Sequence, residues 1–140
     1  MTAADLRFLP EPSAATQAFW EGCSDQQLRL QQCTDCQRWQ FYPRILCTEC
    51  GSRQLQWQTA SGAGTVRSFS VVRRPVSAAY ADDVPYVIVL VALAEGPTMM
   101  SQLVDVAPDQ VQIGAPVRVR FVPWSDEITM PLFELVPSAD

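Results

Sequence analysis

Four cysteines, Cys33, Cys36, Cys47 and Cys50, form two C-x-x-C pairs separated by ten residues. Each pair can place two thiolates on one tight turn, and two such turns at this separation can close on a single tetrahedral metal ion. The chain contains no histidine, so a metal site must use sulfur alone or add carboxylates. Four thiolates favour zinc, with iron as the second choice. The spacing therefore predicts a structural zinc site.

Two other uses of these cysteines are weighed against zinc. Disulfides are one, but the first ten residues lack the basic start and apolar core of a secretion signal. We therefore expect a cytoplasmic protein, and the cytoplasm keeps thiols reduced. A thioredoxin-type redox pair is the other, but it needs one C-x-x-C and not two.

Catalytic groups are not evident in the chain. Cys23 lies outside the cysteine pattern and is expected to be an ordinary small buried residue. A cysteine–histidine pair is excluded within this subunit because histidine is absent, and no G-x-S-x-G motif occurs. The adjacent carboxylates Asp82-Asp83 and Asp126-Glu127 fall in turn-like stretches and are expected to be solvated. We predict no catalytic residues and no enzyme activity of its own.

Size and charge narrow the class of protein further. The 140 residues suffice for one ordinary domain with a small appendage. No apolar run reaches the roughly 20 residues of a membrane span, so no membrane partner is expected. All ten basic residues are arginine and the formal net charge is −5. A negative surface opposes nonspecific binding to nucleic-acid backbones.

The first two segments of the chain are an N-terminal helical segment over residues 1–24 and a zinc ribbon over 25–58. In the first, Ser13 is placed to cap a helix over Ala14–Glu21, and Gly22 is placed to end it. In the second, Leu28 and Leu30 alternate with polar residues and predict a strand that leads into the first cysteine pair.

The third segment, residues 59–140, is strand-like throughout. Glycine and proline turns separate five candidate strands at Val66–Val72, Tyr86–Leu93, Thr98–Val106, Val117–Val122 and Leu132–Val136. The second is nearly all apolar, which predicts a central strand. Five short strands of this kind favour a closed OB-fold barrel, with an open sandwich as the alternative. The predicted fold is mostly β: a short helix, a rubredoxin-like zinc ribbon and a five-stranded OB barrel.

The order of several short motifs resembles a known family. The motifs are Phe19-Trp20-Glu21-Gly22, Cys33-Thr34-Asp35-Cys36, Pro43-Arg44, Cys47-Thr48-Glu49-Cys50-Gly51-Ser52, Trp57, Ser61-Gly62-Ala63-Gly64-Thr65-Val66, Arg74-Pro75, Pro85-Tyr86, Glu95-Gly96-Pro97 and Ile113-Gly114. The whole arrangement is similar to the acyl-CoA-associated proteins that join a zinc ribbon to an OB-fold, long filed as a domain of unknown function. One departure is Gln37, which stands where a glycine often follows the first cysteine pair.

The resemblance implies a non-catalytic accessory subunit. Members of the family bind thiolase-like enzymes, or hydratases and aldolases, of acyl-CoA metabolism and help to form the acyl-CoA channel, for example in steroid or lipid pathways. It implies structural zinc at Cys33, Cys36, Cys47 and Cys50, a hetero-oligomer with the enzyme subunit, and a CoA thioester at the shared interface.

Several residues are candidates for these contacts. Aromatic anchors are favoured at interface centres, so Phe19 and Trp20 are partner-interface candidates, with packing inside the chain as the alternative. Arginine can hold phosphate by paired hydrogen bonds, although an exposed arginine can equally be a solvated charge. The candidates for CoA binding are Arg44, Arg73, Arg74 and Trp124.

Two other classes of function stay open on sequence alone. Zinc ribbons and OB-folds also bind single-stranded nucleic acid through stacked aromatic rings, but the chain has no basic stripe, which disfavours nucleic acid as a partner. An independent acyl-CoA-binding or redox protein is the third possibility.

Overall fold

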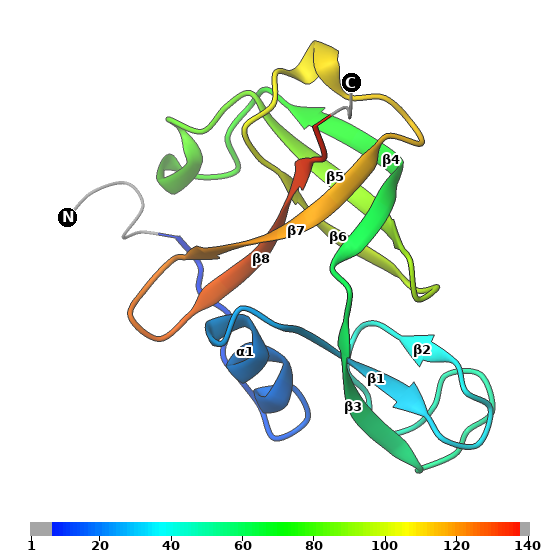
Figure 1. Ribbon diagram of the computed structural model, residues 1–140. Helices are drawn as coiled ribbons and strands as arrows, with labels where there is room; N and C mark the ends of the chain where they lie inside the picture. Colours follow the sequence, from blue (N-terminus) through cyan, green and yellow to red (C-terminus); the bar gives the residue numbers. More distant parts are fainter. Residues whose placement is uncertain (1–6, 138–140) are drawn as a thin grey trace.

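The computed structural model describes residues 7–137, which form a small three-stranded unit below a closed barrel, with one short helix beside both (Figure 1). The helix α1 (Gln17–Ser24) comes first in the chain. A single hydrophobic core runs from this helix through the three-stranded unit into the barrel. The predicted mostly-β fold with one short helix is confirmed.

The helix α1 begins and ends later than the sequence pattern predicted. Ser13 begins a turn before the helix, in which its carbonyl accepts hydrogen bonds from the N–H groups of Thr16 and Gln17. Gly22 lies inside the helix and does not end it, so that prediction was wrong. A Cβ atom at Gly22 would lie 2.8 Å from Cγ of Arg29. Glycine is needed there because the next strand passes close to the helix.

The three-stranded unit holds the four predicted zinc-binding cysteines. Its central strand β1 (Leu28–Cys33) pairs antiparallel with β2 (Trp39–Gln40) on one side and with β3 (Leu55–Ala60) on the other. The first cysteine pair begins where β1 ends, and the second lies in the loop between β2 and β3. The sheet therefore fixes the ends from which both cysteine turns project.

The barrel consists of five strands that close on themselves. They are β4 (Ala63–Val72), β5 (Tyr86–Leu93), β6 (Thr98–Leu103), β7 (Pro116–Pro123) and β8 (Thr129–Leu135). The order around the barrel is β4–β5–β6–β8–β7, with β7 pairing back onto β4 and only β6 and β8 parallel. This closed Greek-key order confirms the OB-fold and excludes the open sandwich.

Alternate residues of β5 show how the barrel is filled. Val87, Val89, Val91 and Leu93 are buried, whereas Leu90 on the opposite face is 36% exposed. The strand β5 is thus buried on its inner face only, although its outer face also carries apolar side chains. Two short 3-10 helices, η2 (Ala78–Tyr80) and η3 (Pro108–Gln110), lie in the loops after β4 and β6.

The junction between the ribbon and the barrel depends on close backbone approach. A Cβ atom at Gly64 would lie 2.6 Å from Cγ1 of Val91 and 2.7 Å from the carbonyl oxygen of Ala92. Only glycine lets β4 run this close to β5. Within the described residues, no helix has the length and apolar character needed to cross a membrane.

Candidate metal centre and adjoining apolar cavity

The four cysteines of the two C-x-x-C pairs converge at one end of the ribbon. Their sulfur atoms all lie within 4.8 Å of one another. The Sγ atoms of Cys33 and Cys50 are 3.6 Å apart, as are those of Cys36 and Cys47. A tetrahedron of sulfurs about 2.3 Å from a zinc ion has edges of about 3.8 Å. The four residues fit a closed zinc-thiolate site, which supplies folding energy and leaves no position for substrate.

Backbone N–H groups of the two cysteine turns point at the sulfurs. The N–H groups of Cys50 and Glu49 lower the pKa of the Cys47 thiol to about 7. The N–H of Cys36 acts in the same direction on the pKa of Cys33. Hydrogen bonds to the charged form favour that form. One thiol of each turn is therefore prepared to bind metal as a thiolate.

Four thiolates cannot gather without a cation. The N–H of Ser52 favours the thiolate of Cys50, but partial desolvation and the neighbouring sulfurs outweigh it and raise the pKa of Cys50 to about 12. Like charges close together disfavour ionisation. A divalent ion removes this repulsion, which is the physical reason that metal binding and folding of the ribbon are coupled.

Gln37 occupies the position where the family pattern has a glycine. Its backbone adopts a left-handed conformation with φ of 67°, which costs a residue other than glycine some strain. Its side-chain amide donates a hydrogen bond of 2.7 Å to the carbonyl of Thr34 across the same turn. The turn has the left-handed geometry that glycine would allow, and the sulfurs of Cys33 and Cys36 beside it lie within the four-cysteine cluster.

Two buried glutamines brace the loop between the cysteine pairs. The Gln40 amide donates a hydrogen bond of 2.8 Å to the side-chain oxygen of Gln31. Gln31 in turn donates to the carbonyl of Arg44 at 2.7 Å and accepts from its N–H at 2.8 Å. Gln40 also accepts a bond of 3.0 Å from the N–H of Thr48, beside the second cysteine pair. The sequence analysis missed this network, because a polar residue at an inward strand position gives no sign of its partners.

Cys23 lies in the helix, away from the metal site. It is completely buried, and burial raises the pKa of its thiol to about 12. A thiol that stays protonated is a poor nucleophile. Its expected role as a small buried apolar residue is the one that these surroundings favour.

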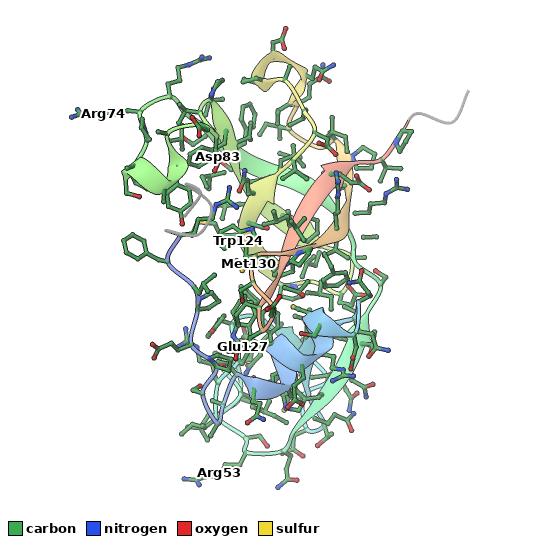
Figure 2. All side chains as sticks on the ribbon, turned by 90° about the vertical axis from the view of Figure 1, so that its left-hand side faces the viewer. Arg53, Arg74, Asp83, Trp124, Glu127 and Met130 are labelled. Carbon is green, nitrogen blue, oxygen red and sulfur yellow. The ribbon has the colours of Figure 1, made fainter. Side chains whose placement is uncertain are left out.

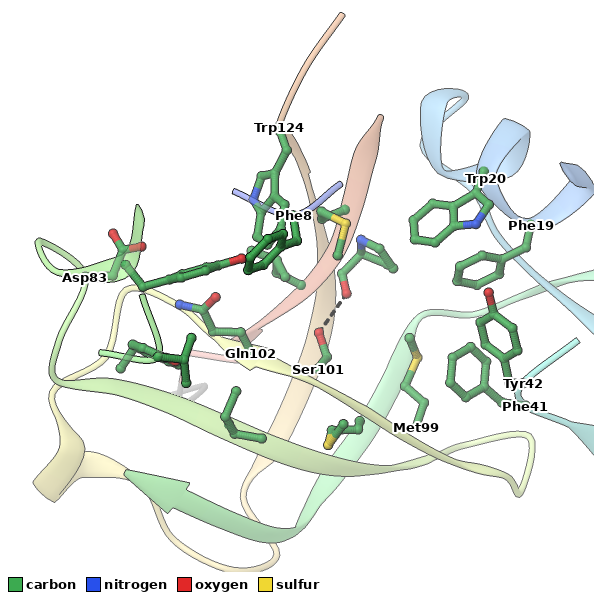
Figure 3. A pocket seen from close by; sticks show the side chains of 18 residues that line it. Phe8, Phe19, Trp20, Phe41, Tyr42, Asp83, Met99, Ser101, Gln102 and Trp124 are labelled. Carbon is green, nitrogen blue, oxygen red and sulfur yellow. Dashed lines mark hydrogen bonds between the residues drawn. The ribbon is translucent and has the colours of Figure 1, made fainter. Parts of the chain in front are cut away.

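An apolar cavity of about 370 Å³ lies between the barrel, the helix and the ribbon. Figure 3 shows one wall formed by the rings of Phe19, Trp20, Phe41 and Tyr42 and the other by Trp124 and Phe8, with Met99 between them. The volume falls within the range of small-molecule sites, which are mostly apolar with few polar groups. Ser101, whose hydroxyl donates a bond of 2.7 Å to the carbonyl of Pro131, is one of the few polar residues here.

Exposed apolar side chains surround the opening of this cavity. Val76 and Met100 both line it and are 73% and 66% exposed, respectively. Apolar groups gathered around a cavity differ from the scattered exposed ones of an ordinary surface. We call Phe8, Tyr42, Val76 and Met100 the apolar rim.

Phe19 and Trp20, the partner-interface candidates, are both buried in the chain. Their rings stack edge-on with centroids 5.0 Å apart, and Phe19 also lies 5.7 Å from Phe41 and 6.2 Å from Tyr42. Packing inside the chain thus accounts for much of their surface. Their part in a partner interface stays a prediction, with the cavity wall as the surface they offer.

The candidates for CoA contact fall into two groups. Trp124 lines the cavity, whereas the side chains of Arg44, Arg73 and Arg74 are exposed; Figure 2 shows Arg74 projecting at the far end of the barrel. Arg44 follows the rim residue Tyr42 by two positions, and Arg74 precedes the rim residue Val76 by two. Two residues span at most about 7 Å, so their backbones lie close to the cavity opening.

One carboxylate differs from its prediction. Asp82 is exposed as expected, but Asp83 is only partly exposed and forms an ion pair of 2.6 Å with Arg7. The expectation that both acidic pairs are merely solvated was therefore wrong for Asp83. Its partner lies 76 residues earlier in the chain, so no local pattern could have indicated the contact.

A four-cysteine ribbon joined to a five-stranded OB barrel defines a class of zinc-ribbon–OB-fold proteins. Residues 20–56 match the family described as "ChsH2, rubredoxin-like zinc ribbon domain", and residues 57–122 match "ChsH2, C-terminal OB-fold domain". The chain belongs to this ChsH2-type family, also called DUF35, as the motif order implied.

Three known proteins show the range of this family. A "DUF35 domain-containing scaffold protein" of Methanothermobacter thermautotrophicus is 37% identical over 91 residues, 64% of this chain and 68% of that protein. A "probable enoyl-CoA hydratase alpha subunit" of Thermomonospora curvata is 37% identical over 119 residues, 83% of this chain, but the chain spans only 36% of its length. The solved "Ltp2-ChsH2(DUF35) aldolase" is 31% identical with a TM-score of 0.81, covering 91% of this chain and 98% of that one.

Proposed function

We propose that this protein is a non-catalytic subunit that binds an enzyme of acyl-CoA metabolism and helps to enclose its acyl-CoA substrate. The observation that carries the proposal is the match over 98% of a chain from an Ltp2–ChsH2 aldolase. Relatives named as scaffold proteins support a binding role, and one named as a hydratase subunit supports acyl-CoA chemistry. The partner is a thiolase-like enzyme, or a hydratase or aldolase.

The apolar rim and cavity are the surface that we assign to this role. A partner that covers the rim would convert the open cavity into part of a closed channel, in which an acyl chain meets aromatic and methionine side chains. We assign contact with the phosphates of CoA, which would lie outside the cavity, to the exposed guanidinium groups of Arg44, Arg73 and Arg74. Trp124 would contact the part of the ligand inside the cavity.

We assign the catalytic groups for acyl transfer to the partner enzyme. Acyl transfer requires a nucleophile, a base and oxyanion donors held together. The thiol of Cys23 is buried and the other cysteines form the zinc-binding set. The zinc ion, held by Cys33, Cys36, Cys47 and Cys50, would supply folding energy and not a reactive centre.

Co-expression of the tagged full chain with acyl-CoA enzymes encoded beside it tests the proposal. We expect a stable complex on size-exclusion chromatography and higher thioester turnover than the enzyme shows alone. Met100→Glu should abolish the complex because it places a charge in the rim. Ile113→Glu is the matched control, since Ile113 is similarly exposed, at 64%, but lies outside the cavity.

Two results would reject the accessory role. One is a candidate enzyme that is soluble and fully active alone and forms no complex with this chain. The other is turnover of a thioester by the isolated chain. Equal loss of the complex in Met100→Glu and Ile113→Glu would reject the rim as the contact surface.

A further inference from the structure

The guanidinium of Arg7 sits in a site made by three side chains of the barrel. Its Nη2 atom is 2.6 Å from Oδ2 of Asp83. Its central carbon lies 4.9 Å from the ring centroid of Trp124 and 5.8 Å from that of Tyr80. A planar cation can stack on aromatic faces while its edge pairs with a carboxylate. These three groups together are suited to bind a guanidinium.

This site lies between two cavities. The apolar cavity is on one side, and on the other is a second cavity of about 260 Å³, with Asp105 and Arg120 in its lining. Asp83, Gln102 and Trp124 line both cavities. Arg7 lines the second cavity while its neighbour Phe8 lines the first. The N-terminal segment therefore passes from the second cavity at Arg7 to the apolar cavity at Phe8.

We call residues 7–12 the N-terminal strap. Within the described chain, its backbone makes no hydrogen bond to the rest of the molecule, and the side chain of Phe8 is 76% exposed. The contacts of Arg7 are thus its main attachment. The Nε atom of Arg7 is buried without a partner among the described residues, which weakens the attachment because an unpaired buried donor is unfavourable. The contact is therefore suited to open and close.

We propose that Trp124, Tyr80 and Asp83 form a guanidinium-binding site, and that Arg7 occupies it in the isolated chain to hold the N-terminal strap between the two cavities. When Arg7 leaves, the apolar cavity and the second cavity, which has the charged side chains Asp105 and Arg120 in its lining, join into one groove. Such a groove suits a linear ligand with an apolar end and a polar, hydrogen-bonding end. The inference that an acyl thioester is the ligand of this groove rests on the proposed function. The inference that Arg7 occupies the guanidinium-binding site does not.

Binding of the neutral apolar dye Nile red to the zinc-loaded full chain tests the proposal. Loss of a partly exposed cation–aromatic contact is equivalent to roughly a fivefold change in an equilibrium, so Arg7→Gln should bind the dye roughly that much more tightly than the unmodified chain. Asp83→Asn should act in the same direction. Arg7→Lys should fall between, because an ammonium cannot stack and pair as a planar group does.

Arg53→Gln is the control, since Arg53 is exposed at the far end of the ribbon, well away from Trp124 (Figure 2); it should leave dye binding unchanged. A second reading is quenching of Trp124 fluorescence by acrylamide, assigned by comparison with Trp124→Phe. It should rise in Arg7→Gln because the ring loses its cover.

Dye affinity and quenching in Arg7→Gln equal to those of Arg53→Gln would overturn the proposal, as would weaker dye binding in Arg7→Gln. Neither reading needs a partner enzyme. If dye binding and quenching change as expected but no enzyme complex forms, the proposed function fails and this inference stands. If the complex forms but Arg7→Gln behaves like Arg53→Gln, this inference fails and the proposed function stands.

Discussion

At the scale of single residues, the five cysteines have different roles because their surroundings differ. Cys47 receives backbone N–H groups that lower its pKa to about 7, while burial raises that of Cys23 to about 12. Nucleophilic and metal-binding capacity both require the thiolate. The same side chain is therefore a metal ligand on one turn and an inert core group in the helix.

We predict that Cys23 resists thiol reagents in the folded, zinc-loaded protein. Its side chain is fully buried and protonated at neutral pH. With a chromogenic disulfide reagent at pH 8, a chelator should release four thiols that react rapidly, and the fifth should react much more slowly until denaturant is added. Mass spectrometry of the labelled peptides assigns each thiol. Labelling of Cys23 in the folded protein at the rate of an exposed thiol would contradict this.

The raised pKa of Cys23 also predicts a pH dependence of stability. Its folded value of about 12 lies above the ordinary value of 9.0, so the neutral thiol is the form that the folded state favours. Its contribution is complete below pH 9 and is lost as the pH rises towards 12. Urea unfolding across this range should show a larger alkaline loss of stability in the unmodified chain than in Cys23→Ala.

The residues that sequence could and could not predict differ in how local their contacts are. The zinc-binding cysteines are recognisable because each pair lies on one turn and their spacing states the chemistry directly. Gln40 carries no such signal, since its importance comes from Gln31 on the neighbouring strand. Arg7 and Asp83 are 76 residues apart, and only the closed barrel brings them together.

At the scale of elements, the helix α1 joins the ribbon to the barrel through aromatic side chains. Phe19 is buried against Trp20 of its own helix and against Phe41 and Tyr42 of the ribbon loop. Aromatic pairs at these separations add to the free energy gained from burial alone. An eight-residue helix is too short to be stable alone in water, so this packing is what keeps it folded.

We predict that Phe19→Ala lowers the free energy of unfolding by about 3–5 kcal/mol, as large-to-small changes of buried phenylalanine do. Phe8→Ala is the matched control: the same change at a site that is 76% exposed should cost less than about 0.5 kcal/mol. Urea denaturation followed by circular dichroism measures both. Similar effects of the two substitutions would mean that Phe19 does not anchor the helix.

The sequence predicted the bounds of β5 more accurately than those of the helix. Tyr86–Leu93 was predicted with the bounds that β5 has, because glycine and proline turns mark its surroundings. The end of α1 was misplaced because Gly22 is the glycine of a close contact with Arg29 and not of a helix end. A glycine marks an unusual backbone requirement, but the sequence does not tell which one.

At the scale of the whole molecule, the barrel and the ribbon are stabilised in different ways. The barrel is filled by buried aliphatic and aromatic side chains such as Val66, Val89 and Phe133. The ribbon instead depends on its metal site and on the buried pair Gln31 and Gln40. A unit that small gains too little from apolar burial to fold alone, so the metal must supply most of its stability.

Removal of the metal should therefore unfold the ribbon and leave the barrel folded. A chelator takes away the cation that lets four thiolates gather, and like-charge repulsion then opens the site. In hydrogen–deuterium exchange with mass spectrometry, peptides of β1, β2 and β3 should lose protection. Those of β5 and β6 should keep it, because both strands lie within the closed sheet.

The helix should respond as an intermediate case, because Phe19 packs on the ribbon loop while α1 also contacts β7 and β8. Re-addition of zinc should restore the ribbon, and Cys23→Ala should lose and regain ribbon protection as the unmodified chain does, because this cysteine is not a ligand. If chelation instead removes protection from β5 to the same extent as from β1, the core that runs through both parts makes them one cooperative unit. The metal would then stabilise the entire OB barrel and not the ribbon alone.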